Sequence, residues 1–488
     1  MKKQKKLLVA NRGEIACRVF QACRELGVET YAMMTAEDEQ SRHVTYADQV
    51  IEVSSYLDIQ SIVKAAKKAK IDMIHPGYGF LSERPDFVKA VEKSGITFIG
   101  PRAQTMELMG KKIAAKKLAE KNKVPTLPWA QISDVKKLAI AAKKIGYPLL
   151  LKASSGGGGK GMRHVNEESE LLAAAESAAA EAQAAFGEAS LFIEKKLISP
   201  RHIEVQVFGD GEGGGVHFFE RECSLQRKHQ KVWEEAPATN LSKKTKDKLF
   251  KYSLKLVKAT RYKSAGTVEF LVNDKEEIFF LEMNTRLQVE HPVTEWITGA
   301  DLVRAQIMQV IDSKSFKLKK TQEPRGHSIE VRLYAEDPFQ GFIPTPGKVM
   351  ELSWPTGPGI RVDSGIEKGQ EVQISFDPML AKLIVWGESR ELALARLRYA
   401  LDETVILGVG TNQAYLRMLC DHPSVIDAKV STQFLENEFK YEDFLPSDNE
   451  MSLIVSASQL GIGKRKQDQL GSQQDIHSPW FEFGGLND

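Results

Sequence analysis

The first hundred residues alternate between short apolar runs and amphipathic segments, and this alternation constrains the fold of the chain most strongly. Residues 6–10 have the composition of a short buried strand, and apolar side chains at spacings of 4, 3 and 4 in 13–26 predict a helix. The pattern recurs in helices expected over 59–70 and 85–94, each of which leads into another strand. Strands that alternate with helices in this way predict a parallel, doubly wound α/β sheet.

Composition limits the classes of protein to which the chain can belong. Its 488 residues predict roughly two to four domains of about 150 residues. Lys plus Arg number 67 and Asp plus Glu 65, a net charge of +2, which argues against a nucleic-acid binder that relies on bulk positive charge. No apolar run approaches the ~18 residues of a membrane span, and the apolar stretch near the N-terminus is too short for a signal peptide. The 4 scattered cysteines fit no disulfide framework, so we expect a cytoplasmic protein without membrane or nucleic-acid partners.

The strongest local motif is the glycine-rich run KASSGGGGKGM at 152–162. Consecutive glycines expose backbone N–H groups and accept positive φ, so this segment can wrap around an anion. It is not a dinucleotide-binding fingerprint, because residues 162–165 predict a strand where that motif requires a helix. It is not a Walker A loop either, because Lys160 precedes Gly161 rather than Ser or Thr. What remains is a flap between two strands that covers phosphates or, alternatively, a surface hairpin without a ligand.

A second motif is a predicted β-hairpin with acidic residues on both strands. The runs GTVEFLV at 266–272 and EIFFLEMN at 277–284 flank the turn residues NDKE. If the turn centres between Lys275 and Glu276, Glu269 lies directly opposite the glutamate at position 282.

The paired glutamates of this hairpin predict a cation site. Like charges directly opposite one another destabilise a sheet, and a hard divalent cation would compensate Glu269 and Glu282. Asn284 lies two residues beyond Glu282, hence on the same face, and adds a neutral oxygen. The set fits Mg²⁺ or Mn²⁺ that carries phosphate oxygens, while the alternative is an acidic ladder that faces solvent.

The segment that follows alternates charged and polar side chains. In an extended chain Arg286, Gln288 and Glu290 would lie side by side. An arginine fork binds a planar oxyanion with two hydrogen bonds, and a nearby carboxylate can remove a proton. Bicarbonate or a carboxylate substrate fits this arrangement, while the alternative is an exposed strand with alternating charges.

A third cluster, at 220–237, is dense in Lys, Arg, His and Gln. Taken alone it is typical of a solvated loop, and His202 is equally ambiguous. Cys223 lacks the flanking base that a nucleophile needs, so we interpret it as a structural residue.

These segments, in this order, resemble the biotin carboxylase family of ATP-grasp ligases. The resemblance runs from residue 6 to roughly residue 440, about nine-tenths of the chain. The matching motifs are ANRGEIACR, HPGYGFLSE, FIGP, KASSGGGGKGM, PRHIEVQV, ERECSLQRKHQKV, GTVEFL, EMNTRLQVEHPVTE, RGHSIEVRLYAEDP and FDPMLAKLIVW.

The resemblance implies an architecture that combines α/β and α+β parts. A pre-ATP-grasp doubly wound domain is expected over 1–110, and an ATP-grasp domain with a mobile lid (about 129–197) over 111–322. A biotin carboxylase C-terminal domain is expected over 323–445. The polar tail 446–488 is expected to be flexible or to dock to a partner.

The resemblance also implies roles for residues that match the family motifs. The positions that match ATP contacts are Lys112, Lys152, Gly157, Gly158, Gly159, Glu194, Lys195, Leu197, His202, Gln226 and His229. The metal-ligand positions are Glu269, Glu282 and Asn284, and the bicarbonate positions are Lys231, Arg286, Gln288 and Val289. Glu290 matches the general base, and Arg332 matches the arginine that faces the ureido oxygen of biotin. Trp233 stands where we expect a small apolar residue.

The activity implied by the resemblance is the first half-reaction of an acyl-CoA carboxylase of the acetyl-, propionyl- or methylcrotonyl-CoA type. ATP would activate bicarbonate as carboxyphosphate, which would carboxylate biotin tethered to a carrier protein, with Mg²⁺ or Mn²⁺ as cofactor. The Ala-Met-Lys-Met motif of a biotin carrier does not occur in these residues, so we expect a separate carrier and a separate carboxyltransferase. The family also implies a homodimer.

Two alternatives stay open at this point. Another ATP-grasp ligase, of the carbamoyl-phosphate or purine-pathway type, would also carry a glycine flap and an acidic pair, but Arg332 and the QRKHQK run disfavour it. A non-catalytic, nucleotide-binding scaffold would have lost a ligand or base, whereas Glu269, Glu290 and Arg286 are all present.

Overall fold

The computed structural model describes residues 4–132, 135–153, 162–186, 190–313, 316, 323–373, 375–444 and 452. Residues 1–439 form one compact unit and 440–488 a second. In the second unit the described residues include a short 3-10 helix, η3 (Tyr441–Phe444). The predicted glycine flap and nearly all of the predicted tail lie outside the described residues.

The N-terminal part contains the predicted parallel sheet. Its five strands are β1 (Lys6–Val9), β2 (Glu29–Met34), β3 (Gln49–Glu52), β4 (Met73–His75) and β5 (Thr97–Phe98), in the spatial order β3-β2-β1-β4-β5. Its helices are α1 (Gly13–Glu25), α2 (Arg42–Tyr46), α3 (Ile59–Lys68), α4 (Pro85–Lys93) and α5 (Ala103–Gly110). The strands pair in parallel, and separate apolar clusters cover the two faces of the sheet, which confirms the doubly wound prediction.

A second helix follows α5 after a one-residue break. The chain leaves α5 at Lys111 in an extended conformation and begins a new helix, α6 (Lys112–Lys121). Lys112 thus stands in the first turn of α6.

The predicted lid contains a four-stranded antiparallel sheet. Its elements are β6 (Trp129–Ile132), α7 (Val135–Ile145), β7 (Leu149–Ala153), β8 (Arg163–Val165), η1 (Glu168–Glu170), α8 (Leu171–Phe186) and β9 (Leu191–Lys195). β7 pairs antiparallel with β8, so the glycine run joins two adjacent strands, as predicted. The glycines themselves, including Gly157, Gly158 and Gly159, lie outside the described residues.

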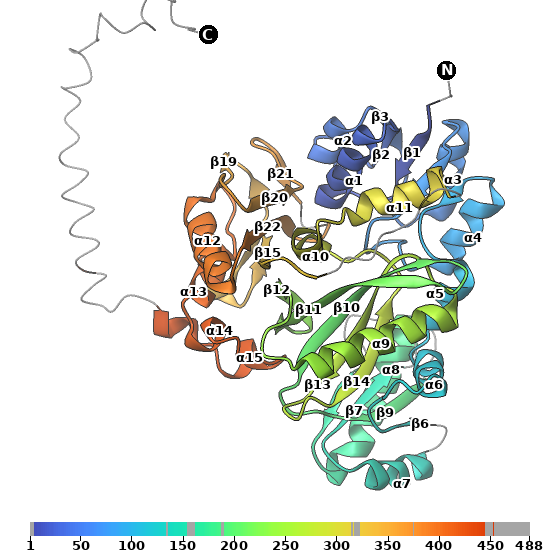
Figure 1. Cartoon of the computed structure of the whole chain (residues 1–488), viewed down its shortest axis with the longest axis vertical. Coiled ribbons are helices and arrows are strands. Elements are labelled where there is room, and N and C mark those ends of the chain that lie inside the picture. Colours follow the sequence, from blue (N-terminus) through green and yellow to red (C-terminus); the bar gives the residue numbers. More distant parts are fainter. Residues whose placement is uncertain are drawn as a thin grey trace, which may run out of the picture. The chain divides into compact units, whose positions relative to one another are not determined.

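An eight-stranded sheet forms the centre of the first unit (Figure 1). In spatial order its strands are β14 (Ile278–Asn284), β13 (Lys263–Val272), β10 (Arg201–Asp210), β11 (Gly215–Arg227), β12 (Gln230–Ala236), β15 (His327–Tyr334), β22 (Met379–Gly387) and β20 (Ile360–Ser364). β12 pairs with β15, so the sheet runs without a break across the domain boundary predicted at 322–323. That boundary stays a prediction.

The helix α9 (Lys243–Thr260) covers one face of this sheet (Figure 1). Its Leu249 and Leu256 pack with Val205, Val268 and Phe270 of the strands below. Side chains on a strand alternate between its two faces, so the neighbours of these apolar residues point to the opposite face.

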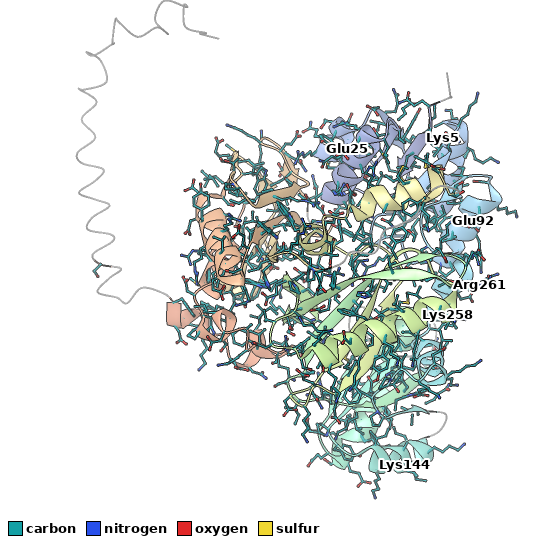
Figure 2. The ribbon with its side chains drawn as sticks, in the orientation of Figure 1. Lys5, Glu25, Glu92, Lys144, Lys258 and Arg261 are labelled. Atoms are coloured by element: carbon teal, nitrogen blue, oxygen red, sulfur yellow. The ribbon has the colours of Figure 1, made fainter. Side chains whose placement is uncertain are left out.

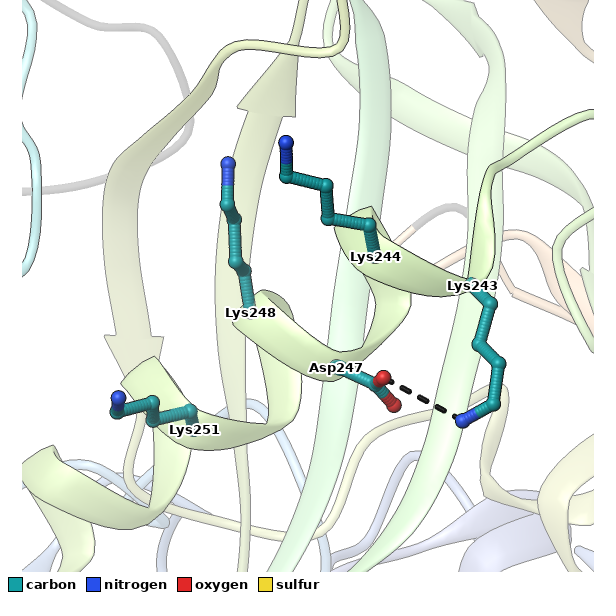
Figure 3. A pocket seen from close by; sticks show the side chains of 5 residues that line it. All are labelled: Lys243, Lys244, Asp247, Lys248 and Lys251. Atoms are coloured by element: carbon teal, nitrogen blue, oxygen red, sulfur yellow. Dashed lines mark hydrogen bonds and ion pairs between the residues drawn. The ribbon is translucent and has the colours of Figure 1, made fainter.

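The outer face of α9 is rich in lysine. Figure 2 shows Lys258 and Arg261 at its C-terminal end, both of which are exposed. A surface hollow of about 500 Å³ on this face is lined by Lys243, Lys244, Asp247, Lys248 and Lys251 (Figure 3). It lies across the sheet from the acidic residues of the predicted site.

The remaining elements complete the C-terminal part and the connections to it. The helices are α10 (His291–Thr298), α11 (Leu302–Ile311), α12 (Arg390–Glu403), α13 (Gln413–Leu419), α14 (Pro423–Ile426), α15 (Phe434–Asn437) and the 3-10 helix η2 (Pro338–Gln340). Three two-stranded sheets pair β16 (Glu336–Asp337) with β17 (Ile343–Pro344), β18 (Gly347–Lys348) with β21 (Glu371–Val372), and β19 (Glu351–Ser353) with β23 (Val405–Leu407). In the described part of the chain no helix combines the length and the apolar character needed to cross a membrane.

The core beneath α9 gives a first prediction. Phe270 is fully buried and packs edge-on against Phe280, so Phe270→Ala would leave a cavity and lower the free energy of unfolding by about 3–5 kcal/mol. Ile140→Ala, at an exposed site on α7, should change it by less than about 0.5 kcal/mol. Urea denaturation followed by circular dichroism compares the two variants, and equal midpoints would contradict this description of the core.

Candidate active site

The acidic face of the central sheet carries the predicted site. His202 and Glu204 of β10 and Glu269 of β13 alternate with the apolar residues that face α9, so they point away from that helix. All three are buried, and the His202 Nε2 atom lies 3.1 Å from Glu269 Oε2. Gln226 lies 2.6 Å from the other ring nitrogen of His202.

Lys231 of β12 joins three of these carboxylates. Its Nζ atom lies 2.6 Å from Glu204 Oε2, 3.0 Å from Glu269 Oε1 and 2.6 Å from Glu290 Oε1. Burial alone would lower the pKa of Lys231, but the three carboxylates outweigh burial and raise it well above its usual value. The ammonium therefore stays charged in the middle of the cluster.

Arg221 of β11 forms a second layer behind Lys231. It is fully buried, and its guanidinium donates to Glu204 Oε1 at 2.5 Å, to Gln288 Oε1 at 2.6 Å and to Thr294 Oγ1 at 3.0 Å. Burial opposes ionisation of Glu204, but Arg221 and Lys231 lower its pKa to about 2.

The hairpin of β13 and β14 places Glu269 directly opposite Glu282, as predicted. The predicted turn centre is wrong, however, because Val272 faces Ile278 next to the turn, which centres the turn on Lys275. A bulge between Glu269 and the following residue shifts the register by one position and restores the acidic pair.

The acidic pair has the chemistry of a cation site. Burial raises the pKa of Glu282, and the negative charge of Glu269 raises it further. Asn284 lies next to Glu269, with an amide contact of 2.7 Å. Two opposed carboxylates and an amide group fit a hard divalent cation, which would relieve the repulsion that raises the pKa of Glu282.

The segment after β14 does not form the extended chain that we considered. It bends from position 285 onward, and Glu290 becomes the N-cap residue of α10. Arg286 turns toward Glu83, with Nε 3.0 Å from Oε2, because this carboxylate from the N-terminal part also accepts from the backbone N–H of Thr285. Gln288 donates to Glu269 Oε1 at 2.7 Å.

The bend still directs the predicted residues toward one cluster. Glu290 contacts Lys231 through Oε1 and the Arg332 Nη2 atom through Oε2 at 3.1 Å. Arg332 of β15 also donates from Nε to Glu234 at 2.7 Å. Burial and the nearby Glu204 raise the pKa of Glu290, but Lys231 and Arg332 prevail and hold it below its usual value.

A separate group of residues lies where β9 leaves the lid. Glu194 is buried between Lys152, whose Nζ lies 2.7 Å from Oε2, and Lys116 of α6. Lys195 donates instead to the carbonyls of Gly146 and Tyr147, at 3.0 and 2.7 Å.

The other residues predicted to contact the nucleotide are less buried than Glu194 or do not contact it. Leu197 is half-buried just beyond β9, and His229 is exposed in the turn between β11 and β12. Burial lowers the pKa of Lys112, although the carboxylates of Glu282 and Glu194 oppose this. The electrostatic surroundings of Lys112 therefore include both Glu282 and Glu194.

Several residues of the site were not predicted from the sequence. Glu204 could have been found, because it follows His202 by two positions on a strand. Lys116 and Glu83 contact partners 78 and 203 positions away, so no local pattern indicates them. Arg221 lies directly opposite Glu204 on the neighbouring strand β11. Trp233 is buried opposite Leu225 and Val331.

Three family models together match most of the chain. They are described as biotin carboxylase, N-terminal domain, over residues 3–106, carbamoyl-phosphate synthase L chain, ATP binding domain, over 111–315, and biotin carboxylase C-terminal domain over 330–437.

Curated relatives include the alpha subunit of the mitochondrial methylcrotonoyl-CoA carboxylase of Dictyostelium discoideum, 44% identical over 99% of this chain and 70% of that protein. The alpha chain of the mitochondrial propionyl-CoA carboxylase of Sus scrofa is 42% identical over 95% of this chain and 65% of that protein. The A subunit of the pyruvate carboxylase of Methanothermobacter thermautotrophicus is 44% identical over 96% of both chains. The chain thus spans about two thirds of the two mitochondrial relatives and nearly all of the pyruvate carboxylase relative.

Solved structures are similar over the same part of the chain. A biotin carboxylase–β,γ-ATP complex from Campylobacter jejuni aligns with a TM-score of 0.86 at 41% identity, over 88% of this chain and 98% of that one. The biotin carboxylase domain dimer of Hydrogenobacter thermophilus 2-oxoglutarate carboxylase, in complex with MgADP, ADP and bicarbonate, aligns with a TM-score of 0.85 at 43% identity, over 88% and 97%.

The lysine pair around Glu194 gives a second prediction. Lys152 and Lys116 hold the pKa of Glu194 below its usual value against the effect of burial, so Glu194→Gln would leave two buried ammonium groups without their counter-ion. We expect a loss of about 3–5 kcal/mol in unfolding free energy at pH 6. The loss should be smaller at pH 9, because an unpaired buried lysine has a lowered pKa and sheds its proton as the pH rises.

Urea denaturation at the two pH values measures this effect. Glu168→Gln is the matched control, since Glu168 forms an exposed pair with Lys143 that contributes about 1 kcal/mol at most. A loss for Glu194→Gln that is independent of pH would contradict the role given to the lysines.

Proposed function

Because the chain belongs to the biotin carboxylase family, we propose that it carboxylates biotin on a carrier protein with ATP and bicarbonate. The observation that carries this proposal is the contact series from Lys231 through Glu290 to Arg332. In this buried cluster the Glu290 carboxylate, whose pKa is lowered, contacts the two cations. The cluster lies beside the acidic pair that we propose as a metal site. Members of this family are ATP-dependent ligases, and this chain is one of them.

In the first step, Arg286 of the bent segment and Lys231 of β12 would receive bicarbonate. Arg286 and Lys231 would hold its oxygens, while Gln288 and the Val289 backbone would fix its orientation. Glu290 would take the proton of bicarbonate, since its lowered pKa keeps it ionised at neutral pH. The freed oxygen would attack the γ-phosphorus of ATP in line, so that ADP leaves and carboxyphosphate forms.

In the second step, carboxyphosphate would break into CO₂ and phosphate within the closed site. Phosphate would remove the proton from N1′ of biotin, and N1′ would then attack CO₂. Negative charge develops on the ureido oxygen as the proton leaves, and the Arg332 guanidinium is the group proposed to stabilise it. Glu234 contacts both the Nε and the Nη2 atoms of Arg332, and Glu290 also contacts Nη2, so two carboxylates hold the guanidinium in place.

A divalent metal fits the residues that would hold it. Glu269 and Glu282 oppose one another, and Asn284 adds an amide group, so these three side chains are the proposed ligands of Mg²⁺ or Mn²⁺. When bound, such ions neutralise the charge of the β- and γ-phosphates. The related Hydrogenobacter complex, which contains MgADP and bicarbonate, supports this assignment.

The Glu194 group is the proposed adenine end of the site. Lys112 and Lys152 would contact phosphates, and the residues Glu194, Lys195 and Leu197 would line the base, together with His202, Gln226 and His229. Closure of the glycine run at 157–159 would exclude water and protect carboxyphosphate from hydrolysis. The domain limits predicted at 110, 322 and 445 are proposed on the same grounds.

The finer identity of the reaction is also a proposal. Relatives that are named as single chains of larger carboxylases support an enzyme of several subunits, with a separate biotin carrier, a separate carboxyltransferase and a homodimeric carboxylase core. Methylcrotonoyl-CoA, propionyl-CoA and pyruvate carboxylase subunits are about equally similar to this chain, so similarity does not identify the final acceptor. We propose that the separate carboxyltransferase decides whether the acceptor is an acyl-CoA or a keto acid. A cytoplasmic location stays a prediction, since two of these relatives are mitochondrial by name.

The base gives the test of the proposed function. Glu290→Gln removes the proton acceptor but keeps its size, so biotin-dependent ADP release should fall by about 100-fold or more. Glu391→Gln, at an exposed site on α12, should keep wild-type activity. A coupled assay for ADP with bicarbonate, Mg²⁺ and free biotin measures both variants.

Two outcomes would overturn the proposal. If ADP release requires ammonia or an amino acceptor and ignores biotin, the chain is another ATP-grasp ligase. If calorimetry detects ATP binding without turnover, even with a biotinylated carrier, the chain is a nucleotide-binding scaffold.

The acidic pair gives a separate prediction. Glu282→Gln removes one proposed ligand, so the Mg²⁺ concentration for half-maximal ADP release should rise by about 10- to 100-fold. Glu277→Gln, an exposed change just before the same strand, should leave it unaltered. An unchanged Mg²⁺ dependence in Glu282→Gln would show that this glutamate is not a ligand.

A further inference from the structure

Lys382 lies behind the predicted bicarbonate segment. It falls within the FDPMLAKLIVW motif, but the family resemblance gives it no role. It stands in the middle of β22 and is fully buried. Its cross-strand neighbours are Arg332 on β15 and Asp363 on β20. The strand therefore places a second cation directly beside the arginine of the site.

The ammonium of Lys382 makes three contacts with separate parts of the fold. It donates to the Val289 carbonyl at 3.0 Å, and it lies 3.3 Å from Glu14 Oε2 and 3.5 Å from Asp363 Oδ2. Burial alone would lower the pKa of Lys382, but the carboxylates of Glu14 and Asp363 outweigh it and raise the pKa. Lys382 therefore donates as a charged group.

The orientation of the Val289 carbonyl affects the orientation of the residues on either side of it. The residue lies in the bend between Gln288, which contacts Glu269, and Glu290, the N-cap residue of α10. A donor on this carbonyl fixes the plane of the peptide that joins Val289 to Glu290. The direction in which the Glu290 carboxylate leaves the backbone depends on that plane.

We propose that Lys382 is a positioning residue that holds the Val289–Glu290 peptide and thereby aims Gln288 and Glu290 at bicarbonate. The inference rests on the proposed function for the identity of the substrate. The contact itself is independent of that function.

Glu14 connects the N-terminal part of the chain to Lys382. It lies in the first turn of α1, within the ANRGEIACR motif, and it is buried. Burial raises its pKa to about 7, although Lys382 opposes this. Lys382 thus connects the bend to both α1 and β20, which come from the two ends of the first unit.

The test separates positioning from a merely structural role with two variants. Lys382→Met removes the donor but leaves Glu14 buried beside an apolar side chain, which destabilises the fold. The double variant Lys382→Met with Glu14→Gln removes that unpaired acid, while Asp363 keeps its contact with Arg361 at 2.7 Å. We therefore expect the double variant to recover most of the lost thermal stability.

Kinetics of the full chain then give the first readout. In both variants the KM for bicarbonate should rise by about 10- to 100-fold, while the KM for ATP should change by less than about threefold, because the Glu194 group lies elsewhere. Lys368→Met, at an exposed ion pair with Glu351, should leave both constants unaltered. A double variant with recovered stability and the wild-type KM for bicarbonate would overturn the proposal.

Hydrogen exchange gives a readout that does not need catalysis. Amides of the peptide that covers 286–292 should exchange faster in the double variant than in the wild type, whereas the core strand β13 should keep its protection. Unaltered exchange over 286–292 would overturn the proposal even if the wild type proved inactive. An inactive wild type with faster exchange in the variant would refute the proposed function alone.

Discussion

The site depends on one ammonium group among three carboxylates. Glu204, Glu269 and Glu290 are buried, so they have lost the water that would screen their mutual repulsion. Lys231 contacts all three at 3.0 Å or less, which keeps them ionised and close together. A buried ion pair contributes little net stability, but the loss of one partner is costly, so this cluster fixes geometry more than it adds free energy.

The residues of the cluster come from several strands of the continuous central sheet. β10 and β13 supply the acidic residues, β12 supplies Lys231, and β15 supplies Arg332. The bend after β14 brings Glu290 to the meeting point of these strands. The predicted ATP-grasp and C-terminal domains therefore share one site, and neither half of the sheet holds both Lys231 and Arg332.

Local patterns predicted the parts of this site that depend on local physics. The assumed turn centre placed Glu269 opposite Glu282, and this pair forms because a bulge compensates for the shifted turn. The composition around the glycine run predicted the strands on either side of it. The extended chain considered for 286–290 does not form, because Arg286 turns to Glu83, a partner 203 positions away. The bulge beside Glu269 was not predicted either, because the position of a bulge depends on the packing of the strand against its neighbours and not on its own sequence alone. Resemblance to a family supplied the roles of Lys231 and Arg332, which no spacing rule indicates.

Attack of bicarbonate on the γ-phosphate of ATP within this cluster is the central claim. The most direct test follows an oxygen atom from ¹⁸O-labelled bicarbonate, with ATP, Mg²⁺ and biotin, by mass spectrometry of the inorganic phosphate released. The oxygen that bridges carbon and phosphorus in carboxyphosphate stays on phosphate when CO₂ departs, so each phosphate should carry one ¹⁸O atom. Unlabelled phosphate, formed while biotin is carboxylated, would contradict the claim.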